Sequence, residues 1–275
     1  MIIDTHTHLF APDAQRYPVD PEASYTPEVP GSVELLRQKM DESGVDRALT
    51  ISPWPYRWDM RYVLDIIAEN RHWLAVGVLV DPFDPRGPEQ LAAYVRDHGV
   101  CGLRIQGRIL GMEPLDQAAT TPLWKAAADL DITLDVNASQ PEYDAVAQRA
   151  REFPNLRIVL DHCGYVSENL FPPKPSVERV LQMAEYANVY AKMSFVGAAS
   201  SQAYPCDDVH WMVRQIVDAF GPERCMYGSN FPTAQYNSTL SYAETLRLFN
   251  EAIDLSDQER QWILGGTAAK LWSWG

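Results

Sequence analysis

The N-terminal run 2–8, with the sequence IIDTHTH, ends in two histidines that are separated by one residue. Side chains alternate between the two faces of a strand, so Asp4, His6 and His8 share one face if this run is a strand. Two neutral imidazoles directed at one point can hold a divalent cation or polarise a substrate carbonyl group. The alternative is that both are structural residues with hydrogen bonds at a strand end. Their close spacing on an apolar run favours a functional site.

Further ionisable and amide side chains end other apolar runs of the chain. They are Arg104, Gln106 and Arg108, then Asp135 and Asn137, Asp161 and His162, Lys192 and Ser194, and finally Ser229 and Asn230. Burying such groups costs free energy unless they are paired, so their recurrence at the ends of apolar runs indicates a site. Asp161 is out of phase with His162, which predicts that Asp161 points away from the interior and makes a supporting bond. Arg104 and Lys192 are predicted either to bind substrate or to form an internal ion pair.

Eight short β-branched runs alternate with amphipathic segments, and these elements must position the polar groups. The runs are residues 2–8, 47–53, 74–81, 100–106, 132–138, 156–162, 189–196 and 224–230. Helices are predicted over 32–43, between Ser32 as N-cap and Gly44 as stop, and over 207–220. Eight βα units in a chain of 275 residues predict an α/β fold, a (β/α)8 TIM barrel that forms a single domain over residues 1–275. The alternative is an open doubly wound sheet.

Two insertions, 11–31 and 163–176, interrupt the repeat, and each follows the C-terminal end of a predicted strand. The first contains five prolines, which are too many for a helix and indicate a long loop. The active site of a (β/α)8 barrel lies at the C-terminal ends of its strands, so we expect both insertions to roof it. The aromatic segment 54–58 (WPYRW) follows the second strand and is predicted either to form a pocket wall or to pack on the barrel rim.

The composition restricts the partners of the protein. A net charge of −14 opposes a nucleic-acid or anionic-membrane surface, which would need a basic field. The four cysteines lack a C-x-x-C spacing, as is typical of free thiols in a reducing compartment. No run approaches eighteen apolar residues, and the start does not resemble a signal peptide. We therefore expect a cytoplasmic protein that binds a small molecule rather than nucleic acid or membrane, with a homo-oligomer left open.

Five motifs occur in a characteristic order along the chain. They are His6-x-His8, Asp161-His162-Cys163-Gly164, Lys192-Met193-Ser194, Gly228-Ser229-Asn230-Phe231-Pro232 and Leu264-Gly265-Gly266-Thr267-Ala268. Together they resemble the amidohydrolase-related family, amidohydrolase family 2, and the similarity extends almost from end to end. Within this family, the short chain and the Asp-His-x-Gly motif look most like the sugar-lactone, muconolactone and pyrone-dicarboxylate lactonases.

The resemblance implies a site in which the first two histidines, a histidine of strand five or six and an aspartate of strand eight surround a metal or work without one. This chain has Asn137 where many members have histidine and Asn230 where the usual residue is aspartate. An amide does not accept a proton at neutral pH and adds no negative charge, so we expect no two-metal centre. Two hypotheses remain for the cofactor. Either one zinc or manganese ion is held by His6, His8 and His162, or the site is metal-free.

We therefore predict a hydrolase that opens a lactone, or secondarily an amide, in a small carboxylated metabolite. His6 and His8 would polarise the carbonyl group, and His162 would act as general base toward water. The predicted catalytic residues are His6, His8, His162 and Asn230. The predicted substrate-binding residues are Arg104, Arg108, Asn137, Lys192 and Ser194, with the two arginines clamping a carboxylate. The alternatives are a metal-dependent decarboxylase or hydratase of an unsaturated or aromatic acid, and a partner subunit whose site has decayed.

Overall fold

Eight parallel strands form one sheet in the computed structural model, which describes all residues except 108–114, 116, 167–172, 237–238 and 275. The strands are β1 (Ile3–Thr7), β2 (Arg47–Ile51), β3 (Leu74–Leu79), β4 (Gly102–Gln106), β5 (Thr133–Asn137), β6 (Ile158–Leu160), β7 (Val189–Lys192) and β8 (Cys225–Met226). Each strand pairs with the next along the chain. All eight lie within the runs predicted from the sequence.

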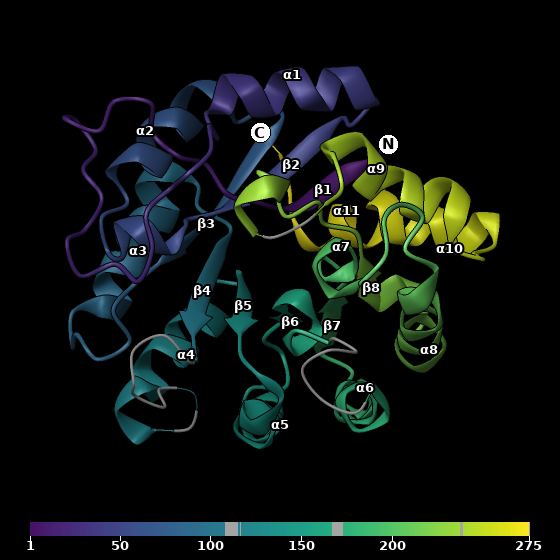
Figure 1. The fold of residues 1–275 in the computed structure, drawn as a ribbon. Helices are drawn as coiled ribbons and strands as arrows, with labels where there is room; N and C mark the ends of the chain where they lie inside the picture. The colour runs from purple at the N-terminus through teal and green to yellow at the C-terminus, as the bar shows by residue number, and fades with distance from the viewer. Residues whose placement is uncertain (108–114, 116, 167–172, 237–238, 275) are drawn as a thin grey trace.

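The sheet closes because β8 and the residues that follow it return to β1. The amide of His8 donates to the carbonyl of Phe231 at 2.7 Å, and the amide of Asn230 donates to the carbonyl of His6 at 2.9 Å. Thr7 and Phe231 also form a parallel bridge. The closed sheet with helices outside it (Figure 1) is the predicted (β/α)8 TIM barrel, and the open doubly wound alternative is wrong.

Helices surround the barrel (Figure 1). They are α1 (Val33–Ser43), α2 (Arg61–Asn70), α3 (Gly87–His98), α4 (Thr121–Asp129), α5 (Tyr143–Glu152), α6 (Pro173–Gln182), α7 (Val196–Ala199), α8 (His210–Phe220), α9 (Tyr242–Arg247), α10 (Asp257–Gln261) and α11 (Thr267–Leu271). The first predicted helix is confirmed with its caps, because the Ser32 side chain accepts from the amide of Leu35 and Gly44 adopts a left-handed φ of 72°. The second begins at His210, after one 3-10 turn.

The barrel interior is apolar at one end and polar at the other. Ile3, Leu49 and Met226 fill the end where the strands begin, together with Trp272 from the C-terminal tail. The indole Nε1–H of Trp272 donates to the hydroxyl of Thr133, the first residue of β5, at 2.9 Å. The tail therefore covers this end, and the polar residues of the later strand positions are left for the other end.

The insertion 11–31 forms no helix or strand and is attached to the loop that follows β8. The hydroxyls of Tyr25 and Tyr236 lie 3.2 Å apart, and the amide of Glu28 donates to the side-chain carbonyl of Gln235 at 2.7 Å. The segment that follows β1 and the segment that follows β8 thus contact each other above the barrel, in addition to the backbone hydrogen bonds that close the sheet. Part of the other insertion, 163–176, lies outside the described residues.

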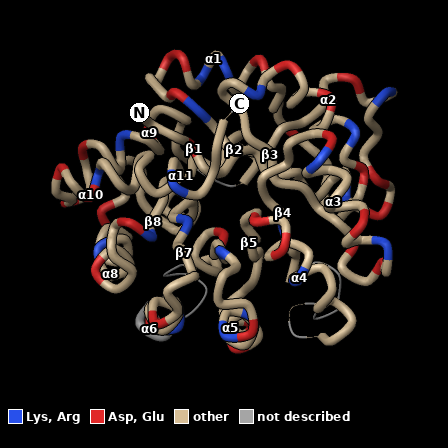
Figure 2. The backbone as a smooth tube through the Cα atoms, turned by 180° about the vertical axis from the view of Figure 1, so that it is seen from behind, with Lys and Arg blue, Asp and Glu red and all other residues tan. Residues whose placement is uncertain are grey.

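The charged side chains lie mostly on the outer helices, where both signs are interspersed (Figure 2). Short ion pairs along single helices, such as Arg37 with Asp41 on α1, account for many of them. Within the described part of the chain, no helix has the length and apolar character needed to cross a membrane.

Candidate active site

A pocket of about 570 Å³ opens above the C-terminal ends of the strands. It is lined by His8, Tyr25, Glu28, Trp54, Arg104, Gln106, Asn137, His162, Tyr165, Val166, Phe195, Ala198, Ala199, Asn230, Gln235 and Tyr236. Five of the predicted site residues are in this lining, and they come from five different strand ends. Both insertions contribute to it, as expected for segments that roof the site. Trp54 confirms that the aromatic segment after β2 forms part of the wall.

His6 of β1 and His8, which directly follows β1, form a T-shaped ring contact. His8 reaches the pocket, whereas His6 lies beneath it and is 0% exposed. Their Nε2 atoms are 3.1 Å apart. The other nitrogen of His8, Nδ1, lies 2.9 Å from the carbonyl oxygen of Ile51, which can only accept, so Nδ1 carries the hydrogen. The Nδ1 of His6 faces the Asp161 carboxylate at 3.4 Å. The Nε2 of His8 therefore has no hydrogen, and the role of the His6 Nε2 in the 3.1 Å contact depends on the tautomer of His6.

This arrangement supplies two nitrogen donors, which is fewer than the three protein ligands of a catalytic zinc site. The ring of His162 packs against His6 with centroids 4.5 Å apart, and its Nδ1 lies 2.9 Å from the Ser194 hydroxyl, so its Nε2 is the nitrogen left for another ligand. Asn230 presents an amide where a carboxylate would complete the set. Among the described residues, no three His, Cys, Asp or Glu side chains stand in metal-binding geometry. The described residues thus show no assembled three-ligand metal site, and no step below depends on a metal.

His162 lies in a left-handed turn directly after β6. Its φ is 53°, and the φ of Cys163 is 46°, so strand alternation stops at Leu160. The ring stacks on Tyr165, with centroids 4.9 Å apart. Burial, together with the charges of Arg104, lowers the pKa of His162 to about 4 against the opposing effect of Asp161. His162 is therefore a neutral imidazole at the pocket wall at neutral pH.

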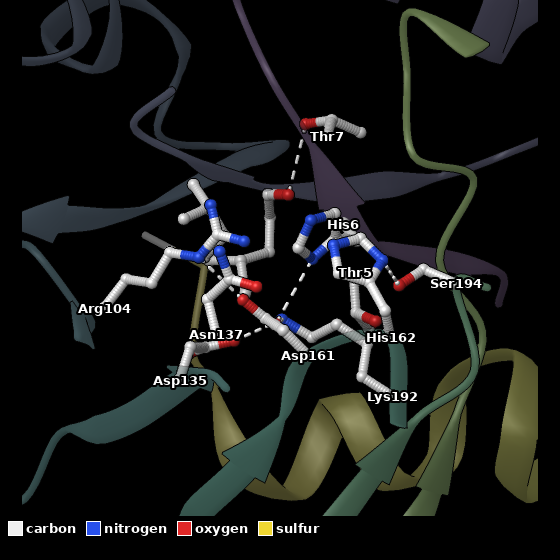
Figure 3. Close-up of polar contacts among 12 residues, drawn as sticks. Thr5, His6, Thr7, Arg104, Asp135, Asn137, Asp161, His162, Lys192 and Ser194 are labelled. Atoms are coloured by element: carbon white, nitrogen blue, oxygen red, sulfur yellow. Dashed lines mark hydrogen bonds and ion pairs between the residues drawn. The ribbon is translucent and has the colours of Figure 1, made fainter. Parts of the chain in front are cut away.

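The same turn corrects the prediction for Asp161. Strand alternation predicts that it points away from the interior, but it is 0% exposed and lies among the site residues (Figure 3). Its Oδ2 is 2.8 Å from the Nε of Arg104, and its Oδ1 is 3.0 Å from the Nζ of Lys192 and 3.4 Å from the Nδ1 of His6. Because β6 ends one residue earlier, Asp161 and His162 both face the interior. The predicted supporting role is retained, but the predicted direction is wrong.

Lys192 does not contact the pocket, contrary to its assignment as a substrate-binding residue. It is 0% exposed and pairs with Asp135 of β5 and with Asp161. Burial lowers the pKa of Lys192, but the two carboxylates outweigh it and hold the pKa above its usual value. Arg104 and Lys192 were predicted, as one of two alternatives, to take part in an internal ion pair. Both do so, and each of these cations pairs with Asp161.

Arg104 connects this buried cluster with the pocket. Its Nε contacts Asp161, while its guanidinium group lines the cavity. Burial lowers the pKa of Arg104, but Asp161 and the weaker effects of neighbouring acidic groups together outweigh burial and raise this pKa, so the guanidinium stays charged. The other predicted arginine, Arg108, lies outside the described residues.

Amide side chains cover another part of the wall. The Asn137 amide donates to the side-chain oxygen of Gln106, and the Tyr165 hydroxyl donates to the side-chain oxygen of Asn137. Within the described protein, the Nε2 of Gln106 and the Oδ1 of Asn230 are buried without a hydrogen-bond partner. One is a donor and the other an acceptor, so a hydroxylated ligand could satisfy both.

Asn230 sits in a loop that β1 holds in place. It has a φ of 61°, a conformation that asparagine tolerates better than most residues. The carboxylate of Asp4 accepts from the amides of His6 and Ser229 at 3.2 and 2.8 Å, so it supports this loop rather than standing behind the histidines. Burial raises the pKa of Asp4 to about 6, partly offset by the bonds from Ser229.

Sequence reasoning did not select three tyrosines of the lining as individual residues. Tyr25 and Tyr165 lie in the two insertions, and Tyr236 lies in the loop after β8. Tyr236 packs against His8 with ring centroids 5.1 Å apart. Periodicity carries no information in such loops. The only available signal was the position of the insertions after strand ends.

Comparisons with known proteins identify the family and the fold. A family model described as Amidohydrolase matches residues 3–274. L-fucono-1,5-lactonase of Burkholderia ambifaria is 26% identical, with 98% of this chain and 94% of that protein covered. The crystal structure of a probable 2-pyrone-4,6-dicarboxylic acid hydrolase from Acinetobacter baumannii has a TM-score of 0.83 at 17% identity, covering 98% of each chain. An amidohydrolase from Burkholderia multivorans with bound zinc has a TM-score of 0.78 at 22% identity, again covering 98% of each chain. These two structures have the same fold.

Proposed function

The chain belongs to the amidohydrolase family, and we propose that it is a hydrolase that opens the ring of a lactone in a small molecule. The observation that carries this proposal is a neutral imidazole, His162, and a permanently charged guanidinium, Arg104, on the wall of one pocket. A base for water and a cation for the developing oxyanion are the two groups that ester hydrolysis requires. The likeness to a sugar lactonase over nearly the whole chain supports the same reaction.

In the proposed reaction, His162 takes a proton from water. This role requires the tautomer in which Nδ1–H donates to the Ser194 hydroxyl, 2.9 Å away, and Nε2 is bare toward the pocket. Ser194 itself is absent from the pocket lining, so it orients the base rather than the substrate. Asn137 and Asn230 are placed to orient the water and the lactone by hydrogen bonds.

Arg104 takes the role of carbonyl polarisation that the sequence hypothesis gave to His6 and His8. His6 is fully buried, and both ring nitrogens of His8 already face protein atoms. The Arg104 guanidinium stabilises the oxygen that becomes negative as water attacks the carbonyl carbon. Cleavage of the ring C–O bond then passes the proton from His162 to the ring oxygen, which gives a hydroxy acid. The His6–His8 pair supports the site from below.

The charges of the lining favour a lactone with hydroxyl groups and no more than one carboxylate. Among the described lining residues, Arg104 is the only cation, and its charge is already balanced by Asp161. Glu28 adds a carboxylate at the rim. The other polar groups are neutral amides and tyrosine hydroxyls, which recognise hydroxyls well. A second substrate carboxylate would find no described cation and would be buried unpaired.

A panel of three lactones tests the proposed function. It contains neutral L-fucono-1,5-lactone, a galactarolactone with one carboxylate, and 2-pyrone-4,6-dicarboxylate. We expect hydrolysis of the first two and a kcat/KM for the dicarboxylate that is lower by at least about 100-fold, as follows from an unpaired buried charge. An aromatic carboxylic acid assayed beside the panel tests the lyase alternative, which release of carbon dioxide from that acid would support. Inactivity on all compounds would support a decayed partner subunit.

The hypothesis of one zinc or manganese ion at His6, His8 and His162 stays a prediction that metal analysis decides. The purified protein should be measured for bound metal and assayed on the lactone panel before and after treatment with a chelator. A stoichiometric metal whose removal abolishes hydrolysis would support this hypothesis. Full activity without metal would support the route through His162 and Arg104.

A further inference from the structure

One buried carboxylate contacts residues from three other strands. Asp161 follows β6, and its two oxygens meet Arg104 of β4, Lys192 of β7 and His6 of β1 (Figure 3). The two oxygens divide these partners, since Oδ2 faces Arg104 whereas Oδ1 faces Lys192 and His6. Asp161 therefore lies between a group that lines the pocket and the histidine pair beneath it.

The cluster is electrically balanced. The carboxylates of Asp135 and Asp161 face the cations of Lys192 and Arg104, so the buried charges sum to zero. Such a cluster adds little net stability compared with apolar packing, because desolvating four charges consumes most of the Coulomb attraction. Its retention inside the barrel is better explained by a requirement for position than by stability.

The contacts of Asp161 set two properties of the site. Pairing through Nε turns the remaining guanidinium nitrogens of Arg104 toward the pocket. An ionised carboxylate only accepts, so Asp161, 3.4 Å from Nδ1, favours the tautomer of His6 that carries its hydrogen on Nδ1 and leaves Nε2 bare toward His8. Lys192, which is also fixed by Asp135, restricts Asp161 to the one place from which it reaches both partners.

We infer that Asp161, held in place by Lys192, is a positioning residue that sets both the direction of the Arg104 guanidinium and the tautomer of His6. The inference rests on the proposed function insofar as Arg104 acts on the lactone. The position of the His6 hydrogen is independent of any substrate.

A double-mutant cycle measures the action through Arg104. Asp161→Asn and Arg104→Gln are each expected to lower kcat/KM on the best lactone by about 10- to 100-fold or more. The double variant should lose clearly less than the product of the two single losses, because both changes disable the same guanidinium. A merely structural role of Asp161 predicts that the losses multiply. Multiplied losses would therefore overturn the inference.

Nitrogen NMR of the labelled protein measures the action on His6. In the parent, the hydrogen of His6 is expected on Nδ1, and in Asp161→Asn it should move wholly or partly to Nε2. An unchanged tautomer would overturn this half of the inference. The measurement needs no substrate, so it remains decisive if no lactone is hydrolysed and the proposed function fails.

A charge-balanced variant covers the case in which Asp161→Asn does not fold. Asp135→Asn combined with Lys192→Met removes one anion and one cation and leaves Asp161 paired with Arg104. We expect it to fold, to lower kcat/KM by about tenfold or more, and to shift the tautomer of His6 as Asp161→Asn would. Parent-like kinetics together with a parent-like His6 would overturn the role of Lys192 and of the cluster.

Discussion

At the scale of residues, the three histidines of the site differ in how many ring nitrogens remain free of protein contacts and can reach a ligand in the pocket. All four ring nitrogens of His6 and His8 already face Asp161, Ile51 or each other before any ligand is considered. In His162, only Nδ1 contacts a polar atom of the described protein, the hydroxyl oxygen of Ser194. His162 is therefore chosen as the base because it has a ring nitrogen without a partner among the described residues, not because it is a histidine.

Replacing His162 with glutamine tests this selection. Because glutamine cannot take a proton from water, kcat should fall by about 10²- to 10⁴-fold while the protein stays folded. His72→Gln, at an exposed position, serves as the matched control and should keep the parent rate. A loss below about tenfold would mean that another group activates water.

The pH dependence of the parent follows from the lowered pKa of His162. Burial favours the neutral ring and puts the pKa at about 4, so the base form is present at neutral pH and is lost as pH falls through that value. We expect kcat/KM to be level from pH 7 to about pH 5 and to fall below it. A fall centred near pH 6.5 in steady-state kinetics would show an ordinary exposed histidine instead.

Asn230→Asp restores the carboxylate that the related family usually has. The change keeps nearly the same shape and the same left-handed backbone, but it adds a negative charge beside the histidines of β1. The charge should raise the pKa of these imidazoles and tighten binding of zinc or manganese by about 10- to 100-fold. Calorimetric titration measures the affinity for metal, and the pH–rate profile reports the pKa values of the imidazoles. If both match the parent, Asn230 lies outside the working site.

At the scale of elements, the sequence pattern was sufficient to predict the strands. It was not sufficient to predict the direction and the partners of the side chains at the strand ends. The short apolar, β-branched runs predicted all eight strands because a barrel buries each strand on both faces. Strand alternation failed at Asp161, since β6 stops at Leu160 and the chain turns left-handed. It could not choose the partner of Lys192, because Asp135 and Asp161 come from other strands and only the closed barrel brings them near.

The contact between α8 and α10 gives an element-scale prediction. Arg214 of α8 lies 2.6 Å from Glu259, which is also the third residue of the capping box that begins α10. The hydrogen bond from Arg214 lowers the pKa of Glu259 to about 2, below its ordinary 4.5. The folded form thus binds the proton less tightly, so the stabilisation is complete above about pH 4.5 and is lost as pH falls toward 2.

Glu259→Gln keeps an oxygen for the capping box but removes the charge and the acceptor that faces Arg214. Because the carboxylate is partly exposed, we expect a loss of about 1–2 kcal/mol in the free energy of unfolding at pH 7. The difference from the parent should shrink between pH 5 and pH 3. Urea denaturation at several pH values measures it, with Glu251→Gln in the exposed pair with Arg247 as control. A difference that is independent of pH would exclude the ion pair as its cause.

At the scale of the whole molecule, the barrel separates chemistry from stability along its axis. The pocket lies above the C-terminal ends of the strands, and the tail with Trp272 closes the opposite end. The polar cluster around Asp161 lies between them, so the apolar layer below supplies the packing that the charges do not. A change at the closed end should therefore alter stability without altering the site.

Trp272→Ala tests this separation. The indole is buried, packs with the interior residues of β1, β2 and β8, and donates to the hydroxyl of Thr133. Its removal should cost about 3–5 kcal/mol in the free energy of unfolding and lower the Tm, because it leaves a cavity at the barrel end. Trp272→Phe, which keeps an aromatic ring but loses the hydrogen bond, should cost only about 1 kcal/mol. For both variants, KM on the best lactone should equal that of the parent at a temperature where each is folded. A KM that rises in proportion to the loss of stability would mean that the closed end and the pocket are coupled, and that the charged cluster between them transmits the strain.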